Sequence, residues 1–511
     1  MRTRTLFLFA SIAGASLLAG EPVRATGPLS TLHAMRAMEM IYGLDLDAAR
    51  KELDAADLDD PNAAVERGRL ALYEEDCDGA ILALARPDVL EKEDAGLLAD
   101  VARGCSRVTA ATVVVRDDAN SIVVRLQDES DRALVPWIIE TTIKARAELT
   151  KDLKVDWPKP TRITVVRDLL SLSAMTGLPY DSARTTGTVA VAKWGRVTLL
   201  SPRASRHGFT WRDTLAHELT HLAVTRATAD RAPLWLQEGV AKREEIRWRA
   251  AGPFDDRPPI DSVVLKGIEL KLDLALDKLG PSIAMLPSAD AAMVAFAEVT
   301  SFVRFYATAG GDDALPNLFV QLRNKKNVDE SLGGGMTLAQ WDAKWRAYLA
   351  GRPRASLSML FGLGADPSAA MELRERVRLA ELLMGRDHPQ AAMRELDRAP
   401  RFGLEDPSSR YVRARTLEAL KRDADARAEV ASPKSVLASY GPWWAIRGRL
   451  YRSAGETSDA NEAFWEALGA DPFDSEVACQ TLDPKEAPAD PALAALCAAA
   501  RATGDPGLGR D

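Results

Sequence analysis

The chain contains 511 residues with 66 basic and 74 acidic side chains, so its formal net charge at pH 7 is −8. This sign excludes nucleic acid as a default partner, because DNA- and RNA-binding proteins rely on an excess of Lys and Arg. With 47% apolar and 27% charged residues, the composition is that of a folded protein and excludes extended disorder. At about 100 to 200 residues per domain, the length predicts three or four domains.

The N-terminal segment has the features of a secretory signal peptide. Arg2 and Arg4 precede an apolar run over residues 6–18, which is too short for a comfortable membrane span. We therefore expect residues 1–25 to be removed, and the mature protein to be periplasmic or secreted without stable membrane insertion. Glu21 occupies the position at which a lipoprotein would carry Cys, so lipidation is not expected. The alternative is an uncleaved N-terminal anchor.

The C-terminal part of the chain repeats with a period of about 34 residues. Ala380, Ala414 and Gly448 occupy one position of the repeat, where one helix of a pair would closely cross the other. These units resemble tetratricopeptide repeats, most clearly in the last one, in which Arg447 stands where Leu is usual. Pro433 falls in the second helix of the middle unit and should shorten that helix. The units cover about residues 373–406, 407–440 and 441–474, within a C-terminal region of residues 353–511 that ends in a helical cap.

Residues 26–106 carry a weaker version of the same pattern, with Ala37 and Ala49 in a first unit and Gly68 and Ala80 in a shortened second one. Stacked helix pairs of this kind need their neighbours in order to bury their apolar faces. Two interpretations stay open. The repeats either form a purely structural stack or present a concave surface to a substrate or partner protein.

Residues 107–352 have a different composition and hydrophobic pattern. Segments rich in Val, Ile and Thr predict strands, and an amphipathic helix over about residues 132–153 separates the second strand from the third. The strand-rich part ends at Ser201-Pro202 and the remainder is helical in pattern, which predicts an α+β domain between two all-α regions. The predicted strands lie at Thr112 to Val115, Ile122 to Leu126, Arg162 to Val166 and, as a strand pair, Thr188 to Leu200.

Two of the five His residues of the chain lie in the motif HELTH at residues 217–221. At helical spacing, His217 and His221 are one turn apart on the same face, where their imidazoles can bind one Zn²⁺. Glu218 lies about 100° around the helix, close enough to hydrogen-bond a water on that metal. The competing interpretation, two histidines without a ligand, loses weight once a second motif is counted.

The sequence also signals the helix that would carry this motif. Thr210 followed by Asp213 predicts a capping box at its N-terminus, and apolar side chains recur on the face opposite the histidines. His207, which precedes the helix, is expected in a loop.

The second motif is PLWLQEGVA at residues 233–241. Glu238, seventeen residues after His221, offers a carboxylate that would complete a site of three protein ligands with water in the fourth position. Gly239 would cost a helix about 1 kcal/mol relative to Ala, which indicates that the helix packs closely against a neighbour there. Glu244 and Glu245 are rival ligands.

The two motifs resemble those of the gluzincins, the thermolysin-type zinc metallopeptidases, and residues 110–350 are similar to the bacterial peptidase MA-like domain. The resemblance implies a zincin-like α+β domain. It also implies that His217, His221 and Glu238 are the zinc ligands and that Glu218 is the general base.

Two further features of the zincin families bear on this chain. Metzincins need Gly and His where it has Val224 and Ala227, which excludes that family. Gluzincins usually add a Tyr or His that hydrogen-bonds the developing oxyanion, but Phe296 stands where a Tyr is expected. Tyr306 and Arg304, on a helix predicted over about residues 291–309, are the remaining candidates, although core packing and a solvated charge are their more ordinary roles.

The sequence thus predicts an exported zinc metallopeptidase flanked by tetratricopeptide-like repeats. Zn²⁺ would polarise the scissile carbonyl and activate a water, and Glu218 would take the proton and deliver it to the leaving amine. A strand within residues 188–200 would offer its edge to an extended peptide, unless that edge is covered. The alternative is a non-catalytic envelope scaffold whose repeats bind a partner and whose zinc site is structural or vestigial.

The four cysteines fit an oxidising compartment, and the chain has no C-x-x-C motif for a thiolate metal site. We expect Cys77 to pair with Cys105 on adjacent helices of the N-terminal stack, and Cys479 with Cys497 on two capping helices after the last repeat. Each bond would close a loop of about 20 to 30 residues and contribute roughly 3 kcal/mol. The alternative is four buried free thiols.

Overall fold

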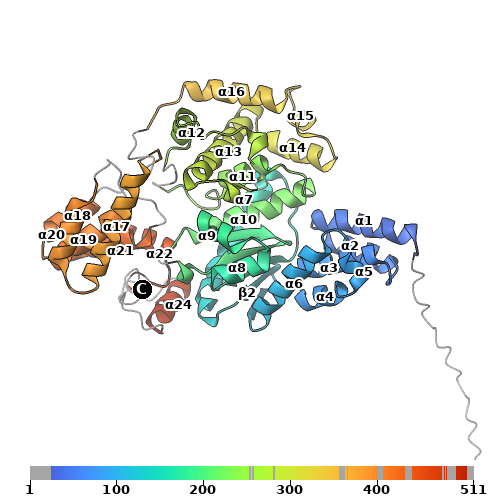
Figure 1. The fold of residues 1–511 in the computed structure, drawn as a ribbon, viewed down its shortest axis with the longest axis horizontal. Coiled ribbons are helices and arrows are strands. Elements are labelled where there is room, and N and C mark those ends of the chain that lie inside the picture. The colour runs from blue at the N-terminus through green and yellow to red at the C-terminus, as the bar shows by residue number, and fades with distance from the viewer. Residues whose placement is uncertain are drawn as a thin grey trace, which may run out of the picture.

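Two sets of helices lie on opposite sides of a central region with a small mixed sheet in the computed structural model of the chain (Figure 1). The structure describes residues 25–502 except for 206, 253–254, 256–257, 280–281, 356–362, 365, 401–406, 432–439, 475–476, 478 and 480–490. Residues 1–24 of the predicted signal peptide and Pro433 lie outside the described residues. Within the described part of the chain, no helix is both long and apolar enough to cross a bilayer.

The N-terminal region is a series of short helices packed as neighbours. Pro28, Pro61 and Pro87 each stand at the start of a helix, where the missing N–H of proline costs nothing. Gly68 permits close packing, since a Cβ at this position would lie 2.6 Å from Cγ of Leu84. The helices are α1 (Pro28–Tyr42), α2 (Leu46–Ala55), α3 (Pro61–Tyr73), α4 (Cys77–Ala83), α5 (Pro87–Leu90) and α6 (Ala95–Thr109).

The sheet has the strand order β1-β2-β3-β5-β4, in which β2, β3 and β5 are parallel and the edge strands β1 and β4 are antiparallel to their neighbours. The predicted strands are therefore present. The last segment is a hairpin, whose turn residues Trp194 and Gly195 both have positive φ, as a two-residue type I′ turn requires. The strands are β1 (Val113–Asp117), β2 (Ile122–Leu126), β3 (Thr161–Val166), β4 (Ala190–Lys193) and β5 (Arg196–Leu200).

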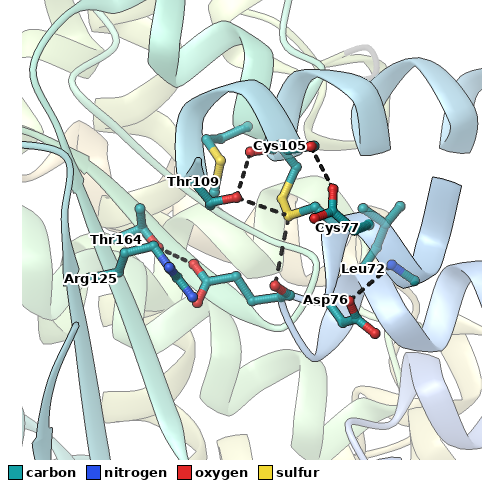
Figure 2. Close-up of a disulfide and its surroundings, with 12 residues drawn as sticks. Leu72, Asp76, Cys77, Cys105, Thr109, Arg125 and Thr164 are labelled. Atoms are coloured by element: carbon teal, nitrogen blue, oxygen red, sulfur yellow. Dashed lines mark hydrogen bonds and ion pairs between the residues drawn. A yellow bond between two sulfur atoms is a disulfide. The ribbon is translucent and has the colours of Figure 1, made fainter. Parts of the chain in front are cut away.

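A polar network joins the sheet to the N-terminal helices (Figure 2). Glu75, between α3 and α4, accepts a hydrogen bond from Thr164 Oγ1 at 2.7 Å and pairs with Arg125 Nε at 3.0 Å. Arg196 of β5 is fully buried and donates to the carbonyl of Leu72 at 2.6 Å. These polar groups of the strands can be buried because the N-terminal helices supply their partners.

Both predicted disulfides are present. Cys77 of α4 is bonded to Cys105 of α6 with a Cα–Cα distance of 5.6 Å (Figure 2), and Cys479 is bonded to Cys497 of α24 (Pro491–Ala502) at 4.9 Å. Their sequence separations of 28 and 18 residues correspond to roughly 3 to 4 kcal/mol each in the loop-entropy description. The second bond anchors the C-terminal helix, which packs against η1 (Glu129–Leu134) of the central region.

After Ser201-Pro202 the central region is helical, as predicted, and the helix predicted over about residues 132–153 is present, whereas α8 and α9 lie in the strand-rich part and were not predicted. A Cβ at Gly239 of α11 would lie 2.5 Å from the carbonyl oxygen of Val299 in α13, which confirms the predicted close packing of the glycine-bearing helix. The helix α10, which carries the HELTH motif, packs against α7, α11, β4 and β5. These elements are α7 (Val135–Leu153), α8 (Leu169–Thr176), α9 (Tyr180–Thr186), η2 (Pro202–Ala204), α10 (Trp211–Thr228), α11 (Leu234–Glu244), α12 (Ile260–Glu269), η3 (Leu276–Lys278), η4 (Ile283–Met285), α13 (Ala289–Gly310), α14 (Ala314–Arg323), α15 (Val328–Ser331) and α16 (Leu338–Ala350).

Three helix pairs are found among the described residues of the C-terminal region, and they coincide with the predicted repeat units except that the first helix already begins at Pro367. Ala380 and Ala414 are fully buried, and a Cβ at Gly448 would lie 2.6 Å from the ring of Phe464, so the repeated small position is where the paired helices approach. The pairs are α17 (Pro367–Met384) with α18 (Pro389–Arg398), α19 (Pro407–Ala419) with α20 (Asp423–Val430), and α21 (Gly441–Ser453) with α22 (Thr457–Ala470).

The last helix pair is attached to the segment just before α10. The amide of Gly441 donates to the carbonyl of His207 at 3.0 Å, and the amide of Phe209 donates to the carbonyl of Ala470 at 3.1 Å. Gly208 lies between them with φ of 69°, and a Cβ there would be 2.5 Å from the Ala470 oxygen. His207 is therefore a loop residue, as expected, and this loop connects α21 and α22 to the start of the HELTH helix.

Candidate metal centre

The metal-binding motif and the third predicted ligand meet where α10 packs against α11. The Nε2 atoms of His217 and His221 are 3.2 Å apart, and Oε2 of Glu238 lies 3.6 Å and 3.7 Å from them. Ligand atoms around a tetrahedral ion with bonds of 2.0–2.1 Å are about 3.3 Å apart. The three atoms are thus spaced almost as the ligands of one zinc-sized cation.

The opposite nitrogen of each imidazole has its own acceptor. Nδ1 of His217 is 3.2 Å from Oε2 of Glu245, and Nδ1 of His221 is 3.4 Å from Oε1 of Gln237. An acceptor at Nδ1 places the ring proton there and leaves the lone pair on Nε2. Two such lone pairs 3.2 Å apart repel each other unless a proton or a metal ion lies beside them.

Glu245, one of the rival ligands, is on the Nδ1 side of His217 and away from the point where the two Nε2 atoms converge. Lys242 Nζ lies 3.0 Å from the same carboxylate oxygen. Burial raises the pKa of Glu245, but the charges of Lys242 and His217 outweigh this effect and lower it to about 2. Glu245 is therefore an ionised carboxylate that orients the imidazole of His217, and the sequence motif gives no sign of this contact.

Glu244, the other alternative ligand, is buried and forms ion pairs with two arginines. It is 3% exposed, contacts Arg243, and lies 3.2 Å from Nε of Arg247. Burial raises the pKa of Glu244 to about 7 in spite of these neighbours. Its ion pairs give it a structural role at the end of α11.

Glu218 approaches the same point from the side of the sheet. The side chain is almost fully buried, and its Oε2 accepts a hydrogen bond from the main-chain N–H of Ala192 in β4 at 2.6 Å. Its carboxylate and the imidazoles of His217 and His221 offer ligand atoms within 4.8 Å of one another. Because the backbone already occupies one oxygen of Glu218, Glu238 is better suited to be the third ligand and Glu218 to exchange a proton.

The charges at the centre are strongly coupled. Burial lowers the pKa of His217, but hydrogen bonds to Glu238 and Glu245 outweigh this effect and raise it to about 9. Burial raises the pKa of Glu238, but His221 and His217 outweigh it and keep the carboxylate ionised. A cation placed between the two Nε2 atoms would therefore compete with the proton on His217.

The two predicted oxyanion stabilisers are not brought to this centre. Tyr306 is 2% exposed, and its hydroxyl donates to the carbonyl of Leu332 at 2.9 Å, so it is a core residue. Arg304 lines a pocket between α12, α13 and α16, together with Asp261 and Tyr348. Both side chains lie on faces of α13 that pack against these other helices.

Phe296, where a Tyr was expected, packs near Lys242, whose Nζ is 5.6 Å from the ring centroid. The predicted capping box of α10 is wrong, because Thr210 makes no side-chain cap bond. Asp213 instead accepts hydrogen bonds from Trp248 Nε1 at 2.9 Å and Arg249 Nη2 at 2.7 Å. A charged partner brought by the fold outcompetes the local cap.

Comparison of the chain with protein-family models, with curated proteins and with solved structures found no match. What the chain itself defines is an α-rich protein with a small mixed sheet and a cluster of two imidazoles and carboxylates that could hold a metal ion.

Proposed function

We propose that this protein is an exported zinc metallopeptidase of the gluzincin type, in which His217, His221 and Glu238 bind the metal and Glu218 is the general base. One observation carries the proposal. Two Nε2 atoms and one carboxylate oxygen form a triangle with sides of 3.2, 3.6 and 3.7 Å, and both Nδ1 atoms face acceptors.

Zinc has to displace the proton held at His217, and the magnitudes favour the metal. With a pKa of about 9, removing this proton at pH 7 costs about 3 kcal/mol. Zinc binding at protein sites supplies on the order of 10 kcal/mol. The metal therefore binds at neutral pH in exchange for a proton.

In this proposal each residue of the site has a separate chemical role. Bound zinc would supply a Lewis acid that polarises the carbonyl of the scissile peptide bond. Glu218 is held through Oε2 by the amide of Ala192, which leaves Oε1 to accept the proton of the attacking water and to pass it to the leaving amine. Gln237 and Glu245 keep the imidazoles oriented throughout.

The flanking helix pairs support a role as tetratricopeptide-like repeats that recruit a substrate or partner protein. Their period of about 34 residues and the close approach at the small position are typical of such repeats. The two disulfides support export, because such bonds persist in oxidising compartments.

A second candidate is a non-catalytic envelope scaffold with a structural or vestigial zinc site. It is favoured by the positions of Tyr306 and Arg304, which leave the predicted oxyanion role unassigned. In β4 only Ala190 is buried, at 6% exposed, whereas Val191 and Ala192 are partly exposed and Lys193 is exposed, so burial covers the strand only at its first residue.

Metal content and peptide cleavage, measured on the same preparation, test the proposal. The wild-type chain should hold about one zinc ion by mass spectrometry and cleave members of a mixed peptide library. Glu218→Gln should keep the zinc and lose activity on the order of 10²- to 10⁴-fold, because an amide cannot accept the proton. Zinc without cleavage in the wild type favours the scaffold, and loss of zinc in the variant would show that Glu218 is a ligand.

A further inference from the structure

The outer strand β4 presents alternate main-chain amides to its free edge. The amide of Leu200 donates to the carbonyl of Val189 at 2.8 Å, so the main chain of Val189 faces β5. Strand alternation then directs Val191 toward β5 as well, and the amides of Ala190 and Ala192 away from the sheet.

At Ala192 this outward amide meets a carboxylate from another element. Its N–H donates to Oε2 of Glu218 at 2.6 Å, and α10, which carries Glu218, packs against β4. At 2.6 Å this hydrogen bond is short for an N–H donor. Glu218 is 7% exposed, so little water competes for the same oxygen.

We infer that the main-chain N–H of Ala192 is a positioning group for the general base, an inference that rests on the proposed peptidase function. This N–H holds the Glu218 carboxylate in one orientation by binding Oε2. The other oxygen, Oε1, is then left to accept the proton of the attacking water. Proton transfer requires the base within hydrogen-bond reach of its target, so a carboxylate free to rotate would spend less time in the productive geometry. The edge of β4 would therefore serve the base at this residue instead of pairing with substrate.

Proline at position 192 removes the N–H without removing a ladder hydrogen bond, which an edge strand tolerates at an outward-facing amide. Ala192→Pro should keep its zinc and lower kcat at least about tenfold, with KM within about twofold of the wild-type value. Ala192→Ser keeps the N–H, so its kcat should exceed that of the proline variant by at least about fivefold. A rise in KM with unchanged kcat would overturn the inference, because it would show that this amide binds substrate.

Amide hydrogen exchange tests the contact without relying on activity. Exchange at Ala192 should be slow in the wild type and at least about tenfold faster in Glu218→Ala, while the ladder amide of Val191 stays the same in both. Equal exchange at Ala192 in the two proteins would refute the positioning role. If the wild type cleaves no peptide, the proposed function fails, and the exchange result still decides whether Ala192 holds Glu218.

Discussion

At the scale of single residues, the proposed metal centre depends on groups other than its proposed ligands. The acceptors Glu245 and Gln237 determine which nitrogen of each imidazole carries the proton. Glu245 is in turn held by Lys242. The HELTH spacing alone predicts two ligands on one helix face but contains no information about these partners, because they belong to a different helix.

Substitutions at the carboxylates should separate a ligand from its neighbours. Glu238→Ala should weaken zinc binding by more than about 100-fold, because it removes a bonding oxygen, whereas Glu245→Gln should weaken it about 10- to 100-fold by loosening His217. Glu244→Gln is the control and should change the affinity less than about threefold. Zinc affinity is measured by competition with a chelator. Undiminished binding in Glu238→Ala would mean that another carboxylate is the ligand.

The same residues predict how zinc binding depends on pH. Because the pKa of His217 is raised to about 9 in the metal-free protein, zinc must release this proton at any lower pH. Apparent affinity should rise about tenfold per pH unit up to about pH 9 from this group alone. Calorimetry at pH 7 in buffers of different ionisation enthalpy should report about one proton released per zinc. A release near zero would contradict the assignment.

The raised pKa has the opposite consequence for the metal-free fold. A histidine whose pKa rises from 6.5 on folding stabilises the protein below pH 6.5, and this stabilisation is lost as the pH rises through about 9. In denaturant unfolding of the zinc-free protein, the contribution of His217 should make the free energy of unfolding lower at pH 9 than at pH 6.5. Added zinc should remove this difference.

At the scale of elements, local sequence patterns predict β1, β2, β3, the segment that contains β4 and β5, and the helices that carry the candidate ligands, but not α8 and α9. Periodicity identifies which face of an element is apolar, and Gly239 marks a close contact before its partner helix is known. The features that the sequence pattern did not predict are contacts between residues that are far apart in the chain. The sequence pattern predicts a cap at Asp213 because it cannot place Arg249 beside it. Buried Arg196 is acceptable in a strand because the carbonyls of Leu72 in the N-terminal helices and of Met175 in α8 accept its hydrogen bonds.

The contacts of Arg447 explain why the last unit has Arg at a position where tetratricopeptide repeats usually have Leu. Its guanidinium, 9% exposed, donates to the carbonyl of Val430 at the end of α20 and lies 4.4 Å from the ring centroid of Tyr451. At the corresponding position of the preceding unit, Arg413 donates to the carbonyl of Leu396 at 2.6 Å. Arginine at this position thus connects the second and the third unit to the C-terminus of the preceding helix pair, where a cation is favourable.

Replacing Arg447 by Leu, the residue usual in such repeats, should therefore destabilise the C-terminal helices. The buried Val430 carbonyl would lose its donor, at a cost of about 1–3 kcal/mol. Thermal unfolding followed by circular dichroism should show a lower midpoint, while zinc content stays the same. A midpoint equal to or above that of the wild type would show that the guanidinium contributes nothing there.

At the scale of the whole molecule, both helical regions are joined to the centre by specific contacts. Glu75 connects the N-terminal helices to β2 and β3, and the loop around Gly208 contacts α21 and α22 and leads to the start of α10. Figure 1 shows these helical regions on opposite sides of the centre. The sequence predicts the order of the three regions, since each has its own pattern. The contacts between the three regions are made by single side chains and by close approaches of the backbone. Such contacts produce no periodic pattern in the sequence, so the sequence does not predict them.

We propose that two imidazoles and Glu238 hold one zinc ion between α10 and α11. Anomalous diffraction at the zinc edge, on crystals of the zinc-loaded full chain, would locate this ion. We predict one anomalous peak within about 2.0–2.2 Å of Nε2 of His217, Nε2 of His221 and a carboxylate oxygen of Glu238. A peak bound by Glu244 or Glu245, or no peak between the two helices, would show that these three residues do not form the site.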